Sequence, residues 1–468
     1  MVALIPVVMF GSIPVIFYLF IRFPAQRAVI ISFVVAWLFL PQVSYPIPIL
    51  PPLTKTSTAC YGILLATIIY DTERITTFKP GWLDIPMVIW CLCPIVSQVT
   101  NGGSPISPTF LQIISWGTPY FLGRLYLGSL DGLRQLAIGI FAGGLAYIPF
   151  TLIEGVKGPI LHQMVYGVNA VDDWSQARRM GGWRPVVFMQ HGLMVGVWMM
   201  TAALIGIWLW QSGTIKKFQG RNIKTLAIIL TIAFFLCRST GAYSLFGIAL
   251  IVLFSAKWFR TSLPLLFIIG YVVFYLYASA SGQFSSKDVM DFITQLFGEE
   301  RAASLKFRFD MEEILGEKAR QRFLFGWGDS GGNRVYNQYG KDISITDSLW
   351  IIAFGIYGTV GLVSLFSSLL LPVVAFCFKY PARTWSNPKV APAAALGVAL
   401  TMYVFDCVLN AMTNPIFAVI AGGISGLVLK APESLKTKKS NSIPKKQSLV
   451  HQKSGGFSGV RSSKALKT

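Results

Sequence analysis

The fold class is decided by two stretches: Ile-Ala-Leu-Ile-Val-Leu-Phe at residues 248–254 and Leu-Leu-Phe-Ile-Ile-Gly-Tyr-Val-Val at residues 265–273. Both are continuously apolar, whereas a strand of a membrane barrel alternates apolar and polar side chains. Backbone groups in hydrocarbon must be hydrogen-bonded within the protein, so only helices and closed barrels cross a bilayer. These stretches therefore predict membrane-spanning helices.

The composition extends this prediction to the whole chain. Of its 468 residues, 54% are hydrophobic and only 13% are charged, against about 25% charged in a soluble domain. We expect an all-α, polytopic transmembrane helix bundle of about 12–13 spans. The first span is predicted to be retained, because no basic region or cleavage site marks a signal peptide. The apolar segments cover approximately residues 2–21, 28–42, 56–70, 82–99, 109–128, 135–153, 185–211, 224–237, 241–256, 262–280, 348–377, 390–410 and 413–429.

The net charge of +20 raises the possibility of a nucleic-acid partner, but its placement argues against one. Much of it lies in short loops between apolar segments and in the tail, where topology signals are expected. If the C-terminus is cytoplasmic, fourteen basic residues fall in the short loops of that side, and only Lys55 and Arg238 fall in the opposite short loops. The fourteen are Arg22, Arg27, Arg74, Lys79, Arg134, Lys216, Lys217, Arg221, Lys224, Lys257, Arg260, Lys379, Arg383 and Lys389. This bias predicts a cytoplasmic C-terminus.

The predicted organisation is a bundle over residues 1–430 and a basic, disordered cytoplasmic tail over residues 431–468. The tail is expected to be a solvated topology anchor, with contact to anionic lipid headgroups as the alternative. Two longer loops, 154–184 and 281–347, fall on the extracytoplasmic side. The second is large and partly helical, with a predicted helix over 299–322. Loops of this length are usually functional or disordered.

The segment Arg-Arg-Met-Gly-Gly-Trp-Arg-Pro-Val-Val-Phe-Met-Gln-His at residues 178–191 predicts an anion site. Pro185 stands where proline is tolerated at the start of a helix, which would put Arg184 at the helix N-terminus and His191 two turns along the same face. Exposed amides, the helix dipole and arginine together favour phosphate. His191 is either catalytic or a buried, hydrogen-bonded histidine.

Two further arginines lie within or between apolar segments. Arg124 ends the sequence Pro-Tyr-Phe-Leu-Gly-Arg. It is either functional or an arginine whose guanidinium reaches the cytoplasmic interface. Arg238 stands in a very tight outer turn, where it binds a ligand or anchors the turn at the interface.

The large loop carries a second group of candidates. Arg301, Ser304, Arg308 and Glu312 would form one polar stripe on a helix, with ion pairing inside the helix as the alternative role. Asp347 closes the loop just before the chain re-enters the membrane. It is a candidate base and also a candidate helix N-cap.

The sequence does not support a metal or nucleotide site, so no cofactor is expected. It has only three histidines and no HxxEH, CxxC, DxD or Walker-type motif. The six cysteines lie in or beside apolar segments, as expected for small buried residues rather than for a disulfide framework.

The chain resembles the O-antigen ligase and polymerase superfamily of the bacterial cell envelope. The resemblance rests on the many spans and the late outer loop, together with four short motifs over roughly residues 180–375. The motifs are Arg301-x-x-Ser-Leu-x-x-Arg308, Phe325-Gly-Trp-Gly328, Asp347-Ser-Leu-Trp350 and Gly355-Ile-Tyr-Gly358 followed by Gly361-Leu.

The resemblance implies a metal-independent inverting glycosyltransferase at the outer face of the inner membrane. Its donor would be a glycan on undecaprenyl diphosphate, and its acceptor another lipid-linked glycan (polymerase) or lipid A core (ligase). Arginines of the outer loops would hold the diphosphate, which gives Arg184, Arg238, Arg301 and Arg308 as candidates. Arg124, within an apolar segment, is a further candidate. Asp347 is the first choice for the base and His191 the second.

One departure from the family pattern favours a polymerase of exopolysaccharide or O-antigen. Ligases carry a His-Asn pair before the span that follows the large loop, where this chain has Asp347 and Ser348. A polysaccharide or lipid transporter or flippase is the main rival, although no related halves are apparent in the sequence. A non-catalytic protein of polysaccharide assembly is the second rival, and other assembly proteins are possible partners.

Overall fold

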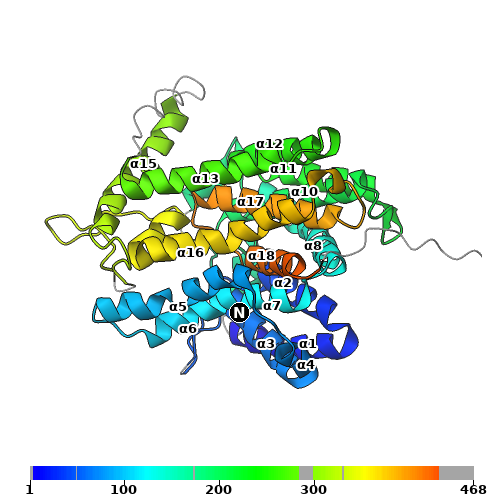
Figure 1. Cartoon of the computed structure of the whole chain (residues 1–468). Helices are drawn as coiled ribbons and strands as arrows, with labels where there is room; N and C mark the ends of the chain where they lie inside the picture. The colour runs from blue at the N-terminus through cyan, green and yellow to red at the C-terminus, as the bar shows by residue number, and fades with distance from the viewer. Residues whose placement is uncertain (1–3, 49, 172–173, 284–298, 329–330, 432–468) are drawn as a thin grey trace, which may run out of the picture. The chain divides into compact units, whose positions relative to one another are not determined.

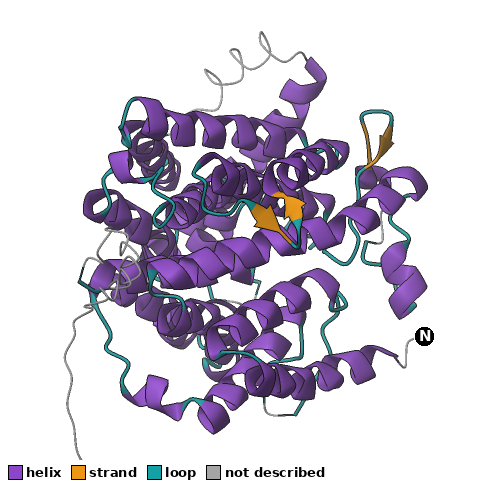
Figure 2. Cartoon of the chain, turned by 90° about the vertical axis from the view of Figure 1, so that its right-hand side faces the viewer, coloured by secondary structure: helices purple, strands orange, loops and turns teal. Residues whose placement is uncertain are grey.

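The computed structural model describes residues 4–48, 50–171, 174–283, 299–328 and 331–431. Over these residues it is almost entirely helical, with two short hairpins (Figures 1 and 2). The predicted tail lies outside the described residues. The helices are α1 (Leu4–Arg22), α2 (Ala25–Phe39), α3 (Lys55–Tyr70), α4 (Thr72–Thr76), α5 (Ile85–Thr100), α6 (Ile106–Gln112), α7 (Thr118–Tyr126), α8 (Leu130–Lys157), α9 (Leu161–Tyr166), α10 (Gly192–Gln211), α11 (Ile223–Leu236), α12 (Thr240–Trp258), α13 (Leu263–Ser281), α15 (Glu299–Arg320), α16 (Leu349–Lys379), α17 (Ala391–Cys407) and α18 (Pro415–Leu429).

Shorter elements complete the described chain. A π-helical turn, η2 (Ile113–Gly117), joins α6 to α7, and a 3₁₀ turn, η1 (Trp82–Asp84), precedes α5. The antiparallel hairpins are β1 (Arg178–Arg179) with β2 (Gly182–Trp183), and β3 (Lys217–Phe218) with β4 (Arg221–Asn222). Two more 3₁₀ turns are η3 (Trp174–Ala177) and η4 (Ala382–Thr384).

The predicted all-α, multi-pass bundle is confirmed. Seven helical segments of the described chain are long and apolar enough to cross a membrane: α1, η1 with α5, α8, α10, α12, α13 and α16. Four shorter apolar helices, α2, α11, α17 and α18, accompany them. The remaining two predicted spans form α3 and the continuous run from α6 to α7. Each of the thirteen apolar segments therefore contains a helix, although residues 185–190 of one segment are not helical, and the number of helices that cross the bilayer stays a prediction.

The core of the bundle is built around α10 and α17. The apolar window of α10 is 89% buried, whereas that of α1 is only 22% buried. A helix that is apolar all round belongs inside a bundle or in lipid, and α10 is surrounded by α8, α11, α12 and α17. α16, α17 and α18 pack against one another beside it (Figure 1).

Glycines allow α7 and α18 to approach closely. A Cβ on Gly422 would lie 1.9 Å from the carbonyl oxygen of Tyr120, and a Cβ on Gly426 would lie 2.6 Å from the Cα of Gly128. Helices in lipid gain stability from close backbone packing, which small residues permit.

The two glycine motifs of the family resemblance contact each other. α16 is kinked at Gly358, which has φ +65° and ψ −163°. The amides of Trp327 and Gly328 donate to the carbonyls of Gly355 and Ile356, at 2.9 and 3.0 Å. The segment after α15 therefore docks on the kink by backbone hydrogen bonds.

The loops lie at the two ends of the bundle. At one end, the side chain of Thr214 donates to the carbonyl of Pro388, and that of Lys379 to the carbonyl of Val428. At the other end lie Arg238, which donates to Gly155 at the end of α8, and Lys55, which donates to the carbonyl of Phe188. α8 has 28 residues, a length of about 42 Å at 1.5 Å per residue.

Candidate functional site

The predicted helix start at Pro185 is wrong. α10 begins at Gly192, so Arg184 does not precede a helix and His191 is not two turns into one. His191 is instead the N-cap residue of α10, and its Nδ1 accepts the amide hydrogen of Leu193 at 3.1 Å. Arg184 nevertheless reaches this helix end in space, because its side chain lies against Gly192, where a Cβ would come within 2.4 Å of its Cδ.

A buried carboxylate explains why residues 185–190 are not helical. Glu154, near the end of α8, accepts hydrogen bonds from the amides of Val186 and Val187 at 2.8 and 2.6 Å, and from Leu161 at 2.9 Å. Val187 has φ +54°, a conformation that a β-branched residue adopts only under strain. Glu154 thus fixes the segment that carries Arg184 and His191.

A cavity of about 450 Å³ brings together three of the predicted site residues, Arg184, His191 and Asp347. Its wall comes from the loops before α10 and α16 and from the loop after α17. The other lining residues are Ala170, Val171, Ala177, Val186, Gln190, Gly192, Thr346, Ala411 and Met412. No local sequence pattern singles out Gln190 or the loop after α17.

Arg184 supplies the buried positive charge of this cavity. It is 8% exposed, and none of the four ion pairs among the described residues includes it. Burial lowers the pKa of its guanidinium from 12.5 to about 10, with further lowering by Arg179 and Arg308. The group remains charged at neutral pH, so the cavity suits an anion.

Arg238 positions Arg184 rather than lining the cavity. Its Nη1 donates to the carbonyls of Trp183 and Gly155, at 2.9 and 3.2 Å, which ties the β1–β2 hairpin to α8. Its own carbonyl accepts from Nε of Arg184 at 3.3 Å. The guanidinium of Arg238 is therefore committed to the protein backbone.

His191 is neutral in this environment. Burial lowers its pKa from 6.5 to about 4, helped by Arg184, Arg308 and Arg179 and opposed by Asp347. Because Nδ1 accepts a backbone hydrogen bond, the neutral ring carries its hydrogen on Nε2. The side chain is thus suited to donate a hydrogen bond.

Asp347 does not cap α16. The N-cap position belongs to Ser348, and the Asp347 side chain is exposed at the cavity. The predicted capping role is therefore wrong, because the helix begins one residue later than such a role requires.

Arg308 is held beside the cavity by the end of α17. Its Nη1 donates to the carbonyl of Leu409 at 3.0 Å and to Oδ1 of Asn410 at 3.1 Å, and Nδ2 of Asn410 donates to Oδ1 of Asp406 at 3.0 Å. Asp406 is 8% exposed. Sequence reasoning missed Asn410 and Asp406, although an aspartate within an apolar span is a recognisable signal.

Glu312 anchors α15 to the bundle. It accepts hydrogen bonds from Tyr275 of α13 at 2.8 Å and from Trp350 of α16 at 3.2 Å, and burial raises its pKa. Arg308 and Glu312 therefore each bind the bundle, and neither takes part in an ion pair of the described residues. The side chains of Arg301 and Ser304 lie outside the described part of the chain.

Arg124 does not join this site. It is 7% exposed, forms an ion pair with Asp84 at 3.2 Å, and lies just before the start of α8, at the opposite end from Arg238.

No family model matches the chain, and a search of curated proteins finds no match.

Proposed function

We propose that this protein polymerises lipid-linked oligosaccharide repeat units, carried on undecaprenyl diphosphate, into exopolysaccharide or O-antigen at the outer face of the bacterial inner membrane. The observation that carries the proposal is the cavity where Arg184, His191 and Asp347 meet, with Arg308 beside it. Two cations can stabilise a diphosphate leaving group, a carboxylate can accept the proton of an acceptor hydroxyl, and a hydrogen-bond donor can orient the substrate.

The reaction would be an inverting displacement. Asp347 accepts the proton of an acceptor hydroxyl, whose oxygen attacks the anomeric carbon of the donor glycan. The bond from that carbon to the diphosphate oxygen breaks, and the electron pair leaves on undecaprenyl diphosphate. Arg184 and Arg308 stabilise the charge that develops on this leaving group.

The low pKa of His191 separates the roles of the two candidate bases. A group with a pKa of about 4 whose Nδ1 already accepts a hydrogen bond is a weak base at neutral pH. We assign Asp347 as the base and His191 as a donor from Nε2 to a phosphate or sugar oxygen.

The test uses full-length protein in detergent or nanodiscs with undecaprenyl-diphosphate oligosaccharide as the sole glycan. Wild type should give a ladder of longer glycans, and Arg184→Gln should lose it. Lys217→Gln, which removes an exposed cation from the β3–β4 hairpin, is the matched control. No elongation by wild type would reject the polymerase proposal.

Two added measurements separate the rivals. A single transfer to lipid A core without a ladder would indicate a ligase. Translocation of a fluorescent lipid-linked glycan across proteoliposomes without elongation would indicate a transporter or flippase, and absence of all three activities would favour a non-catalytic assembly protein.

A further inference from the structure

A second polar cavity lies at the opposite end of the bundle from the His191 cavity. Its volume is about 460 Å³, and four of its lining residues are basic: Arg74, Lys79, Arg124 and Lys430. The other lining residues are Thr77, Phe78, Pro80, Gly81, Leu125 and Leu429. Ten residues from three parts of the chain thus place four cations around one space.

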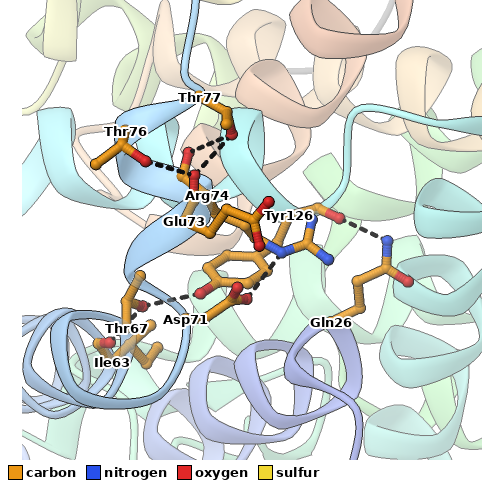
Figure 3. A network of polar contacts seen from close by, with 9 residues as sticks. All are labelled: Gln26, Ile63, Thr67, Asp71, Glu73, Arg74, Thr76, Thr77 and Tyr126. Carbon is orange, nitrogen blue, oxygen red and sulfur yellow. Dashed lines mark hydrogen bonds and ion pairs between the residues drawn. The ribbon is translucent and has the colours of Figure 1, made fainter.

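Two of the cations are held in fixed positions by the fold. Figure 3 shows Arg74 directed at Asp71, with its Nε 2.8 Å from Oδ2, and its guanidinium lies 5.0 Å from the ring centre of Tyr126. Tyr126 is itself held by Thr67, to which its hydroxyl donates at 3.1 Å.

Arg124 is fixed by a different set of contacts. Its Nε donates to Asp84 at 3.2 Å, and its Nη2 donates to the carbonyl of Lys79 at 3.1 Å. Asp71 and Asp84 are the two carboxylates of these ion pairs, and neither lines the cavity. Glu73 of α4 is exposed and does not line it either. Four cations against two paired carboxylates leave an excess of two positive charges.

An apolar groove adjoins the cations. It has a volume of about 520 Å³ and is lined by Trp82, Leu371, Val374, Ala375, Phe378, Lys379 and Val428. The groove and the basic cavity share the end of α18, because Val428 lines one and Leu429 the other. Lys379 links them by donating to the carbonyls of Val428 and Lys430. Trp82 and Phe378 are 57% and 75% exposed, as expected for side chains that face lipid near an interface.

We infer that this composite site binds one anionic phospholipid, with its phosphate headgroup in the basic cavity and an acyl chain in the groove. The charge excess selects an anionic over a zwitterionic headgroup. The adjoining groove selects a lipid over free phosphate, because a soluble anion gains nothing from an apolar wall. The site assigns Arg124 a role that is independent of the glycan reaction.

The test measures lipid retention by native mass spectrometry of full-length protein supplied with phosphatidylglycerol or phosphatidylcholine of equal chain length. Wild type should retain phosphatidylglycerol selectively, and the double variant Lys79→Glu with Lys430→Glu should bind it at least about tenfold more weakly. The double variant Lys216→Glu with Lys217→Glu makes the same charge change in the β3–β4 hairpin and should bind as wild type does. Equal loss in both double variants, or none in either, would overturn the inference.

Three further measurements keep the inference testable if the charge variants unfold. Wild type labelled with phosphatidylglycerol that carries a photoreactive acyl chain should form adducts at Trp82, Phe378 or Val428, and labelling confined to other helices would overturn the site. Ala375→Trp should reduce phosphatidylglycerol retention by filling the groove. If inorganic phosphate or glycerol phosphate displaced the lipid at equal concentration, the groove would have no role and the lipid assignment would be wrong.

Discussion

Nη1 of Arg308 lies 3.1 Å from Oδ1 of Asn410, so a helix of the large loop is fastened to the end of a core helix. Behind Asn410 stands the buried carboxylate of Asp406, whose Oδ2 has no hydrogen-bond partner among the described residues. The hydrogen bonds from Asp406 through Asn410 thus fix Arg308, which the sequence predicted only as one of several polar residues on a single helix face.

Asn410→Ala is expected to release Arg308. Loss of a hydrogen bond to a charged group costs about 1.5–3 kcal/mol, so the rate of glycan elongation should fall about 10- to 100-fold if Arg308 stabilises the leaving group. The measurement is the ladder assay with kcat and KM determined separately. A fall in kcat supports positioning for chemistry. Gln338→Ala removes an exposed amide of the same loop and should leave both constants unchanged.

Asp347→Asn is expected to abolish most elongation while donor binding persists. Removal of a general base costs about 10²–10⁴ in rate, and the amide keeps the size of the side chain. Donor binding is followed by tryptophan fluorescence or by native mass spectrometry. Asp131→Asn, an exposed carboxylate at the other end of the bundle, is the control. Full activity of Asp347→Asn would transfer the base role to another residue.

The stability of the protein should depend on pH through His191. Its folded pKa of about 4 lies below the ordinary value of 6.5, so the unfolded chain binds more protons between these two pH values. The contribution of His191 to the free energy of unfolding should be fully present above about pH 6.5 and should decline as the pH falls toward 4. His191→Asn keeps an N-cap side chain and should flatten this part of the profile. The check is the midpoint of thermal unfolding in detergent, measured at pH 7 and at pH 4.5. The same fall in midpoint between these pH values for wild type and His191→Asn would contradict the prediction.

Glu154→Gln is expected to destabilise the loop that carries Arg184 and His191. The amide NH₂ of glutamine cannot accept a hydrogen bond, so in either orientation of the amide the donors to Oε2 (Val186 and Val187) or the donor to Oε1 (Leu161) lose their acceptor. Leaving a buried donor unsatisfied costs about 1–3 kcal/mol, so the unfolding midpoint should fall measurably. Glu313→Gln changes an exposed carboxylate on α15 and should not shift it. An unchanged midpoint for Glu154→Gln would show that the segment is held by other contacts.

Gly358→Ala tests the kink of α16. Its φ of +65° with ψ of −163° belongs to a region that only glycine occupies readily, and a Cβ would lie 2.3 Å from the backbone of Leu324. We expect a loss of about 2 kcal/mol or more of unfolding free energy. Gly270→Ala in α13 meets open space and should be neutral or slightly stabilising. The measurement is the midpoint of thermal unfolding in detergent. Equal midpoints for Gly358→Ala and Gly270→Ala would mean that the docking of residues 323–328 does not depend on the kink.

The sequence was a good guide wherever a local pattern suffices. Each predicted apolar segment contains a helix, because helix formation in lipid follows from apolar runs alone. It failed at Pro185, where Glu154 overrides the local start signal by accepting hydrogen bonds from the amides of Val186 and Val187, 32 and 33 residues later in the chain. It also failed to find Asn410 and Asp406, whose partner Arg308 lies on a different element.

The amino-acid sequence by itself determined that the chain is a bundle of apolar helices with its arginines and Asp347 concentrated between them. Only the tertiary structure decided which of those residues meet. Arg184, His191 and Asp347 lie around one cavity. Arg238 donates instead to backbone carbonyls, and Arg124 lines a basic cavity at the other end of the bundle. The reason is physical: spans are encoded by local hydrophobicity, whereas the environment of a charged side chain depends on contacts between segments far apart in the chain.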